Sequence, residues 1–155
     1  MRILVISDSH GNYAQALKAH ERAGEVDHII HLGDGCEDAL FMEQVLEVPV
    51  IRVAGNCDLD GRLPNERCLE LGTSRFFVTH GNNYQVKSGL SRLKARGAEV
   101  AASVVLYGHT HLPAVEALGG VLYVNPGQLK FEGAATCAIV TLDDGAVRAE
   151  ILRLG

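Results

Sequence analysis

The first third of the chain alternates short apolar runs with longer amphipathic segments. The apolar runs at residues 3–6, 28–32 and 50–53 have the length and composition of strands, and the segments at about 12–23 and 37–46 have helical periodicity. A strand–helix–strand unit places its two strands parallel in one sheet. The alternation therefore predicts a parallel sheet whose strands end at one edge, where the following loops can meet.

The rest of the chain reads mainly as hairpins. Turn signals flanked by strand-like runs are centred on residues 72–74, 118–120 and 143–145. A helix at about 89–96 and a buried strand at 101–107 interrupt this pattern. With 155 residues and 47% hydrophobic content, the chain is long enough for one compact core. We therefore expect a single α/β domain over residues 1–155, in which antiparallel strands extend the parallel sheet or pack on it.

Charge and hydropathy exclude several classes of partner. The formal net charge of −5 offers no basic surface for a nucleic-acid backbone, so no stable nucleic-acid complex is expected. The apolar run at 3–6 is too short for the core of a signal peptide, and no stretch approaches the length of a membrane span. Because the four cysteines form no C-x-x-C pair, we expect reduced thiols in a cytoplasmic protein without membrane contact. An apolar strand edge could support a homodimer or a higher homo-oligomer, which the sequence leaves open.

Side chains that bind metals stand where the strand-like runs end. They are Asp8, His10, Asp34, Asn56, His80, His109 and His111. Carboxylate and amide oxygens and imidazole are the ligands of hard and borderline divalent metals. The spacing of Asp8 and His10 points both side chains to the same side of a strand end, and His109 and His111 repeat it. Seven ligands are too many for one structural zinc but suit two metals that share a bridging carboxylate, for which Asp34 is the candidate.

Such a site favours a phosphate ester as substrate. Two divalent ions offset by two aspartates and a bridging hydroxide leave a charge of about +1, which attracts an anion. The metals would lower the pKa of a bound water from ~15.7 towards ~7, so the reaction needs no side-chain nucleophile. The G-x-S-x-G elbow and the Gly-rich P-loop are both absent from the sequence.

The order of the motifs resembles that of the calcineurin-like metallophosphoesterases. DSH at 8, GD at 33, GNCD at 55, THG at 79, GHTH at 108 and NPG at 125 are most similar to their small bacterial and archaeal phosphodiesterase branch. The resemblance implies a layered β-sandwich of two mixed sheets flanked by helices. It also implies two divalent ions, with manganese first among manganese, iron, zinc, nickel and magnesium.

The resemblance also distributes the ligands between two metal sites. The first would consist of Asp8, His10, Asp34 and His111, and the second of Asp34, Asn56, His80 and His109. To the four residues of the second site we also assign catalytic roles.

One position departs from the family pattern. Many members carry histidine where this chain has Cys57, so the usual imidazole proton donor is missing. We therefore expect a preference for phenolic or otherwise acidic leaving groups. Cys57 and Asn12, which stands at a predicted helix N-terminus, are candidate substrate contacts. Cys36 and Cys57 could each be a soft ligand, an oxidation-sensitive thiol or a small neighbour of the metals, and Asp58 could orient a metal-binding histidine or lie in solvent.

Two functions from different classes remain. The first is a metal-dependent phosphoesterase, above all a phosphodiesterase, that uses a dinuclear metal centre and metal-bound hydroxide to hydrolyse a small phosphate ester. The alternative is a metallophosphoesterase fold that serves as a protein-binding scaffold with little or no catalysis, as in the similar retromer subunit. The complete set of predicted ligands favours the enzyme.

Overall fold

The alternating first third of the chain forms one half of a mixed sheet in a computed structural model, which describes residues 1–59 and 61–155. Its elements are β1 (Arg2–Ile6), α1 (Tyr13–Ala23), β2 (His28–His31), α2 (Cys36–Leu46) and β3 (Val50–Arg52). Strands β1, β2 and β3 are parallel, as predicted. The long C-terminal hairpin, β9 (Thr136–Asp143) and β10 (Ala146–Arg153), extends this sheet on the other side of β1, and β9 runs antiparallel to it.

The middle of the chain forms the second sheet. Its strands are β4 (Glu66–Leu71), β5 (Ser74–Thr79), β6 (Val104–Leu106), β7 (Ala114–Leu118) and β8 (Val121–Asn125). Within the described residues, the two sheets have five strands each, in the orders β10-β9-β1-β2-β3 and β4-β5-β6-β8-β7. Both sheets are mixed, because β5, β6 and β8 are parallel while β4 and β7 are antiparallel to their neighbours. The expected sandwich of two mixed sheets is confirmed.

The helix of the second sheet differs from its predicted limits. Gly89, with φ +132°, ends a short 3-10 turn (η2, Val86–Ser88), so α3 begins only at Ser91 and continues to Glu99. Ala101 has φ +57°, which turns the chain after the helix and shortens the predicted strand at 101–107 to β6. The further 3-10 turns are η1 (Asn82–Tyr84) and η3 (Glu132–Ala134).

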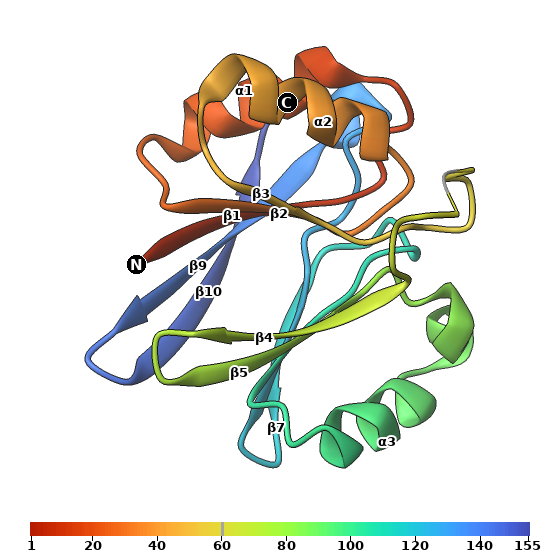
Figure 1. The fold of residues 1–155 in the computed structure, drawn as a ribbon, viewed down its shortest axis with the longest axis vertical. Coiled ribbons are helices and arrows are strands. Elements are labelled where there is room, and N and C mark those ends of the chain that lie inside the picture. Colours follow the sequence, from red (N-terminus) through yellow and green to blue (C-terminus); the bar gives the residue numbers. More distant parts are fainter. Residues whose placement is uncertain (60) are drawn as a thin grey trace.

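Apolar side chains separate the molecule into layers. Ile3, Val5 and Ile30 of the first sheet meet Phe76 and Val78 of the second in the central core. The opposite face of β1 carries Leu4 and Ile6, which pack beneath α1 and α2, while Phe77 and Val105 pack with Leu93 of α3. Figure 1 shows α1 and α2 on the outer face of one sheet and α3 on the outer face of the other. A strand buried on both faces reads as a continuous apolar run, which explains the pattern at residues 3–6.

Hydrogen bonds between loops bring the strand ends of both sheets together. The amide of Asp8 donates to the Gly33 carbonyl at 3.0 Å, and the amide of His10 donates to the Asp34 carbonyl at 2.9 Å. Within the second sheet, the amide of Gly108 donates to the His80 carbonyl at 2.9 Å, and across the sandwich the amide of His109 donates to Oδ2 of Asp8 at 3.2 Å. The loops after β1, β2, β5 and β6 therefore meet at one edge, as the sequence predicted for the first two.

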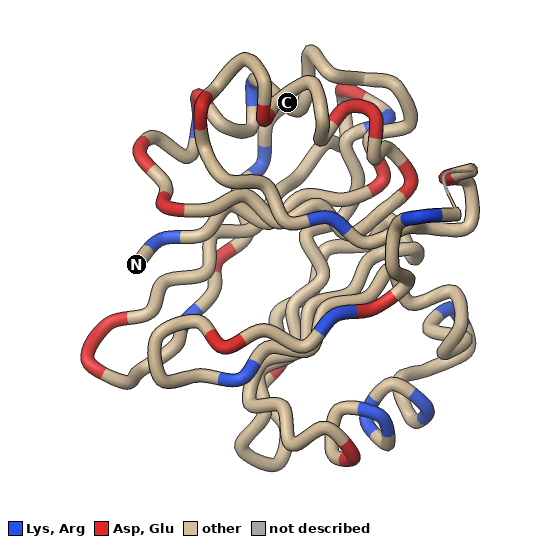
Figure 2. The backbone as a smooth tube through the Cα atoms, viewed as in Figure 1, with Lys and Arg blue, Asp and Glu red and all other residues tan. Residues whose placement is uncertain are grey.

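Charged residues are distributed unevenly over the two outer layers. Figure 2 shows Lys and Arg along η2 and α3, whereas acidic residues lie at several places around α1 and α2. The basic group consists of Lys87, Arg92, Lys94 and Arg96.

Among the described residues, none of the helices has the length and apolar character needed to cross a membrane.

Candidate metal centre

The first group of candidate ligands comes from the loops after β1 and β6. Nε2 of His111 lies 3.1 Å from Oδ1 of Asp8, and Nε2 of His10 lies 3.7 Å from the same oxygen. The Asp8 side chain is fully buried, whereas that of His10 is 20% exposed and that of His111 is 37% exposed. Ligand atoms of the three residues all lie within 4.8 Å of one another. The carboxylate of Asp8 is therefore buried inside the protein, while the two imidazole rings are partly exposed to solvent.

The second group comes from the loops after β2, β5 and β6. Nε2 of His80 lies 3.3 Å from Oδ2 of Asp34 and 3.1 Å from Nδ1 of His109. These three residues also offer ligand atoms within 4.8 Å of one another. His80 is fully buried, and its Nδ1 lies 2.8 Å from the Leu32 carbonyl. Donation from Nδ1 to that carbonyl leaves Nε2 to face the other ligands.

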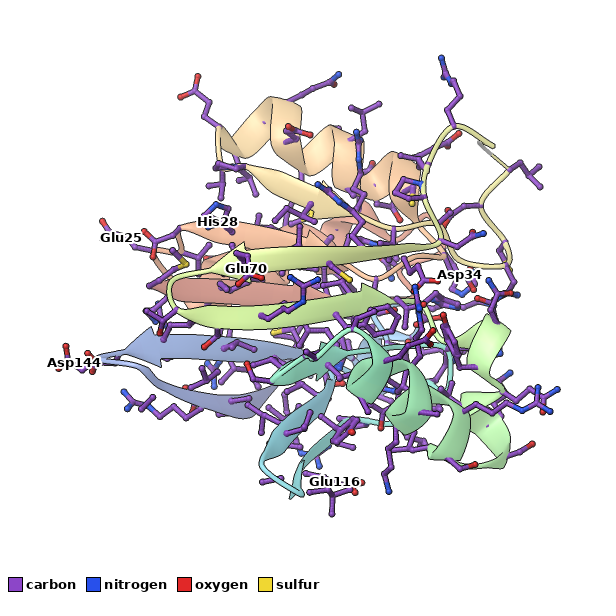
Figure 3. The ribbon with its side chains drawn as sticks, turned by 60° about the horizontal axis from the view of Figure 1, so that its bottom comes forward. Glu25, His28, Asp34, Glu70, Glu116 and Asp144 are labelled. Carbon is purple, nitrogen blue, oxygen red and sulfur yellow. The ribbon has the colours of Figure 1, made fainter. Side chains whose placement is uncertain are left out.

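Asp34 lies between the two groups. Its Oδ2 is 3.7 Å from Nε2 of His10 and 3.3 Å from Nε2 of His80, so one carboxylate reaches a member of each group. Figure 3 shows Asp34 at one end of the strands, with Asp144 at the opposite end. Its Oδ1 accepts the amide of Cys57 at 2.8 Å. This is the position that the predicted bridging carboxylate requires.

Asn56 is the candidate ligand with the fewest contacts to the others. It is exposed, and its Nδ2 donates to Sγ of Cys57 at 3.5 Å. The bond from the Cys57 amide to Asp34 keeps the loop that carries Asn56 beside the candidate bridge.

The protonation states of Asp34 and His109 suit metal binding, whereas His80 must release a proton when it binds a metal. Burial opposes ionisation of Asp34, but hydrogen bonds from His80 and the Cys57 amide outweigh it and hold the pKa of Asp34 well below its usual range. Burial, followed by the charge of His80 and that of Lys87, lowers the pKa of His109. Burial would also lower the pKa of His80, but its bond to Asp34 and the charges of Asp8 and Asp34 raise it. An ionised carboxylate and a neutral imidazole are the forms that coordinate metals.

Most of the candidate ligands have an uncommon backbone conformation. Asp8, His10, Asp34, His109 and His111 have φ values of 56°, 45°, 57°, 69° and 66°, in the left-handed region. Asp, Asn and His adopt this region more readily than other residues with a Cβ atom. Strained backbone of this kind persists only where the surrounding structure imposes it, and it is concentrated at functional sites.

An unsatisfied atom tests whether these residues fit a metal. Nε2 of His10 is buried and has no hydrogen-bond partner among the residues that the structure describes. A buried polar atom without a partner costs roughly 1–3 kcal/mol, and a cation bound between His10, Asp8 and Asp34 would satisfy it. The donor atoms are oxygen and imidazole nitrogen, as hard and borderline divalent ions prefer. The residues therefore fit divalent metal.

The two cysteines near the site differ in their surroundings. Cys36 is buried, and its Sγ donates to the Val53 carbonyl and to Asp58, so burial and the Asp58 charge raise the pKa of this thiol. Its contacts favour the interpretation as a small buried neighbour. Cys57 is exposed and forms, with His10 and Asp34, a third set of possible ligand atoms within 4.8 Å. Asn12 caps α1 by accepting the Gln15 amide, and its predicted contact with substrate stays a prediction.

Neither hypothesis for Asp58 was right. Its carboxylate does not lie in solvent or orient a histidine; it accepts the amides of Asp34, Gly35, Cys36 and Gly55 at 2.7–3.0 Å. These bonds tie the loop after β3 to the loop after β2 and to the first turn of α2. A carboxylate at a helix N-terminus also interacts favourably with the helix dipole.

Sequence reasoning missed a buried group that supports the site: Ser9, His31 and Asp38. Oγ of Ser9 lies 2.9 Å from Nε2 of His31 and donates to Oδ2 of Asp38 at 2.6 Å. These are the residue types of a hydrolase triad, but the hydroxyl is fully buried and gives its proton to the aspartate, so it is no nucleophile. The available signals were weak: a serine between two ligands and an aspartate in the first turn of a helix.

A cavity of ≈ 310 Å³ opens beside the first group of ligands. Its lining residues include His10, Asp34, Glu37, Cys57 and Leu59. A larger hollow lies beside Met1 and Arg2, and its lining includes none of the seven candidate ligands. The cavity at the candidate metal centre is therefore the one that matters for chemistry.

Comparison with known proteins identifies the family. A family model described as a calcineurin-like phosphoesterase superfamily domain matches residues 1–145. The chain belongs to this superfamily. The probable metallophosphoesterase YsnB of Bacillus subtilis (strain 168) is 36% identical over 152 residues, which cover 94% of this chain and 87% of YsnB. The resemblance that the motifs predicted is confirmed, and the superfamily is metal-dependent, which agrees with the three sets of candidate ligands.

Solved structures show the same fold in two settings. The structure of a novel archaeal phosphodiesterase matches with a TM-score of 0.79 and 25% identity. The match covers 98% of this chain and 100% of the archaeal chain. A Zn²⁺ complex of Vps29 from Entamoeba histolytica matches with a TM-score of 0.75 and covers 100% of both chains. Its identity of 17% means that it shows the fold alone.

Proposed function

We propose that this protein is a metal-dependent phosphoesterase, above all a phosphodiesterase, that acts on a small phosphate ester. The observation that carries the proposal is the position of Asp34, which reaches His10 of one ligand group and His80 of the other. Membership of a phosphoesterase superfamily and the fold of an archaeal phosphodiesterase support it. The cavity of ≈ 310 Å³ beside Asp34 suits a small substrate.

The seven residues would hold two divalent ions, for which manganese is the first choice. Asp8, His10, Asp34 and His111 would form the first site, and Asp34, Asn56, His80 and His109 the second. When bound, two such ions supply a nucleophile derived from water and neutralise charge on the phosphoryl oxygens. The protein's own part is to keep Asp34 ionised, to fix the ring of His80 through Leu32, and to hold His109 neutral at the solvent side.

Cys57 determines how well the proposed enzyme can protonate a leaving group. Burial and the charge of Asp34 raise the pKa of this thiol, so it stays protonated and is a poorer acid than the imidazolium that many relatives place there. A leaving alkoxide would receive little help, whereas a phenolate needs none. We therefore propose a preference for aryl or otherwise acidic leaving groups.

The test combines metal content with turnover. Elemental analysis of the purified protein should find about two metal ions per chain, and manganese should stimulate hydrolysis of a chromogenic aryl phosphodiester. The His80→Ala protein should lose the second ion and most of the rate, while the matched His20→Ala variant, in α1, should behave like wild type. Equal rates for wild type and His80→Ala would contradict the assigned site.

The alternative function is a protein-binding scaffold, and the match to Vps29 over the whole chain is the observation that favours it. Bound metal without turnover of any aryl or alkyl phosphoester would support this alternative. The proposed enzyme requires turnover that depends on both ligand groups.

A further inference from the structure

The buried contact between Ser9, His31 and Asp38 joins three segments that carry or flank candidate ligands. Ser9 stands between Asp8 and His10, and His31 ends β2, just before the loop of Asp34. Asp38 lies in the first turn of α2, and its Oδ2 accepts both the Ser9 hydroxyl at 2.6 Å and the Gly11 amide at 2.9 Å. Ser9 and His31 are fully buried and Asp38 is 6% exposed, so water does not compete for these bonds.

The direction of each hydrogen bond follows from one backbone donor. The amide of Gly33 donates to Nδ1 of His31 at 3.1 Å, so this nitrogen carries no proton. The proton of the neutral ring is then on Nε2, which donates to Oγ of Ser9 at 2.9 Å. The Ser9 hydroxyl is left to donate to Asp38. Each donor in this series of hydrogen bonds, from the Gly33 amide through His31 to the Ser9 hydroxyl, therefore has one acceptor.

This chain of bonds fixes the loop of Asp8 and His10 against the loop of Asp34. A Cβ atom at Gly35 would clash with Oγ of Ser9, so the backbone of the second loop lies directly on the network. Both loops contain ligands in the left-handed conformation, which needs support from outside the loop. The amide of Gly11, which Asp38 accepts, immediately follows His10.

We propose that Ser9, His31 and Asp38 are positioning residues that set the first metal site by holding Asp8 and His10 in their strained conformation. The proposal rests on the proposed metal-binding function and adds three residues to it, none of which touches metal or substrate. Because Oδ2 of Asp38 makes both bonds, an asparagine could place its amide oxygen there and keep them. Geometry, rather than the charge of Asp38, is then what the first site needs.

The experiment is a calorimetric titration of the full-length protein with Mn²⁺. Reference variants assign the binding steps: His10→Ala should remove the first-site step and Asn56→Ala should weaken the second. In Ser9→Ala and Asp38→Ala we expect first-site affinity to fall about 10–100-fold, the range for residues that orient metal ligands, with the second step changed less. Asp38→Asn should stay within about threefold of wild type, a change smaller than the lower end of that range.

A matched control separates positioning from general damage. Ser103→Ala removes a hydroxyl that donates to the Arg75 carbonyl at 3.4 Å, at the ends of β5 and β6 opposite to those that carry His80 and His109. It should leave both binding steps unchanged, and circular dichroism should show that all variants are folded.

The outcomes distinguish this inference from the proposed function. If wild type binds two ions and Ser9→Ala binds both as tightly, the inference is wrong and the proposed function stands. If Asp38→Asn loses the first step as Asp38→Ala does, charge rather than geometry is responsible and the inference is also overturned. A folded wild-type protein that takes up no Mn²⁺ would overturn both.

Discussion

The ligand loops of the two sheets are supported by different chemistry. In the first sheet, the carboxylates of Asp38 and Asp58 accept backbone amides of the loops after β1, β2 and β3. In the second sheet, the side chain that supports the loop after β6 from within the sheet is neutral: Asn125 donates from Nδ2 to the Gly108 carbonyl at 3.2 Å and to Oγ1 of Thr110 at 2.9 Å. A carboxylate reaches this loop only from the first sheet, where Asp8 accepts the His109 amide at 3.2 Å. Carboxylates of the first sheet and an amide side chain of the second therefore support the ligand loops along one edge of the sandwich. Loops at equivalent strand ends need not be held by the same kind of side chain.

The largest effect should come from the residue shared by both halves. Asp34→Asn should abolish phosphodiester hydrolysis and weaken both metal-binding steps by more than the roughly 100-fold upper range for residues that only orient ligands. The matched control is Asp144→Asn in the turn between β9 and β10, at the opposite end of the strands (Figure 3), which should behave like wild type. Activity and Mn²⁺ titration measure both, and retention of either binding step by Asp34→Asn would argue against a shared bridge.

Urea unfolding tests whether the carboxylate of Asp58 stabilises the fold more than the amide of Asn125 does. Asp58→Ala removes the acceptor of four backbone amides and should lower the free energy of unfolding by about 3 kcal/mol. Asn125→Ala removes two bonds of a neutral amide and should cost about 1–2 kcal/mol. Equal losses in the two variants would contradict the stronger support that the four bonds of Asp58 are expected to give.

His80 and His111 differ in how much each stabilises the fold in addition to its predicted role as a metal ligand. His80 is fully buried and bonded to the Leu32 carbonyl, whereas the His111 side chain is 37% exposed. His80→Ala should lower both metal affinity and the free energy of unfolding, the latter by about 2–3 kcal/mol because it leaves a cavity and an unpaired carbonyl. His111→Asn, which keeps a residue type that tolerates the left-handed backbone at φ 66°, should lower metal affinity with a change in unfolding free energy below about 0.5 kcal/mol. Comparable destabilisation by both substitutions would contradict this separation.

The smallest effect concerns the leaving group. Cys57→His places an imidazole where a protonated thiol now lies and should raise the rate for alkyl phosphodiesters by roughly 10-fold or more while changing aryl esters less. Cys57→Ser, which supplies no comparable acid, should leave the ratio of aryl to alkyl rates unchanged. The ratio of kcat/KM for the two ester classes is the measurement, and an unchanged ratio in Cys57→His would remove Cys57 from the account of specificity.

The sequence predicted what depends on local pattern. Periodicity placed β1, β2 and β3 and their helices within a few residues, and the ends of apolar runs located the candidate ligands. It could not predict the partners of Asp58, because four amides from two separate loops converge on it only after the sheet has formed. His31 lies in an apolar strand, so its sequence context gave no sign of the bonds to Ser9 and Gly33.

The left-handed backbone at Asp8, His10, Asp34, His109 and His111 affects how the sequences of such proteins can change. Most residues pay a conformational penalty in that region, whereas Asp, Asn, His and Gly pay less. A relative that no longer used metal would therefore still be selected to keep these residue types, simply to remain folded. Retention of the ligand residues in an alignment therefore reflects the requirements of the backbone as well as chemistry, and turnover measured together with metal binding is the better criterion for separating enzymes from scaffolds.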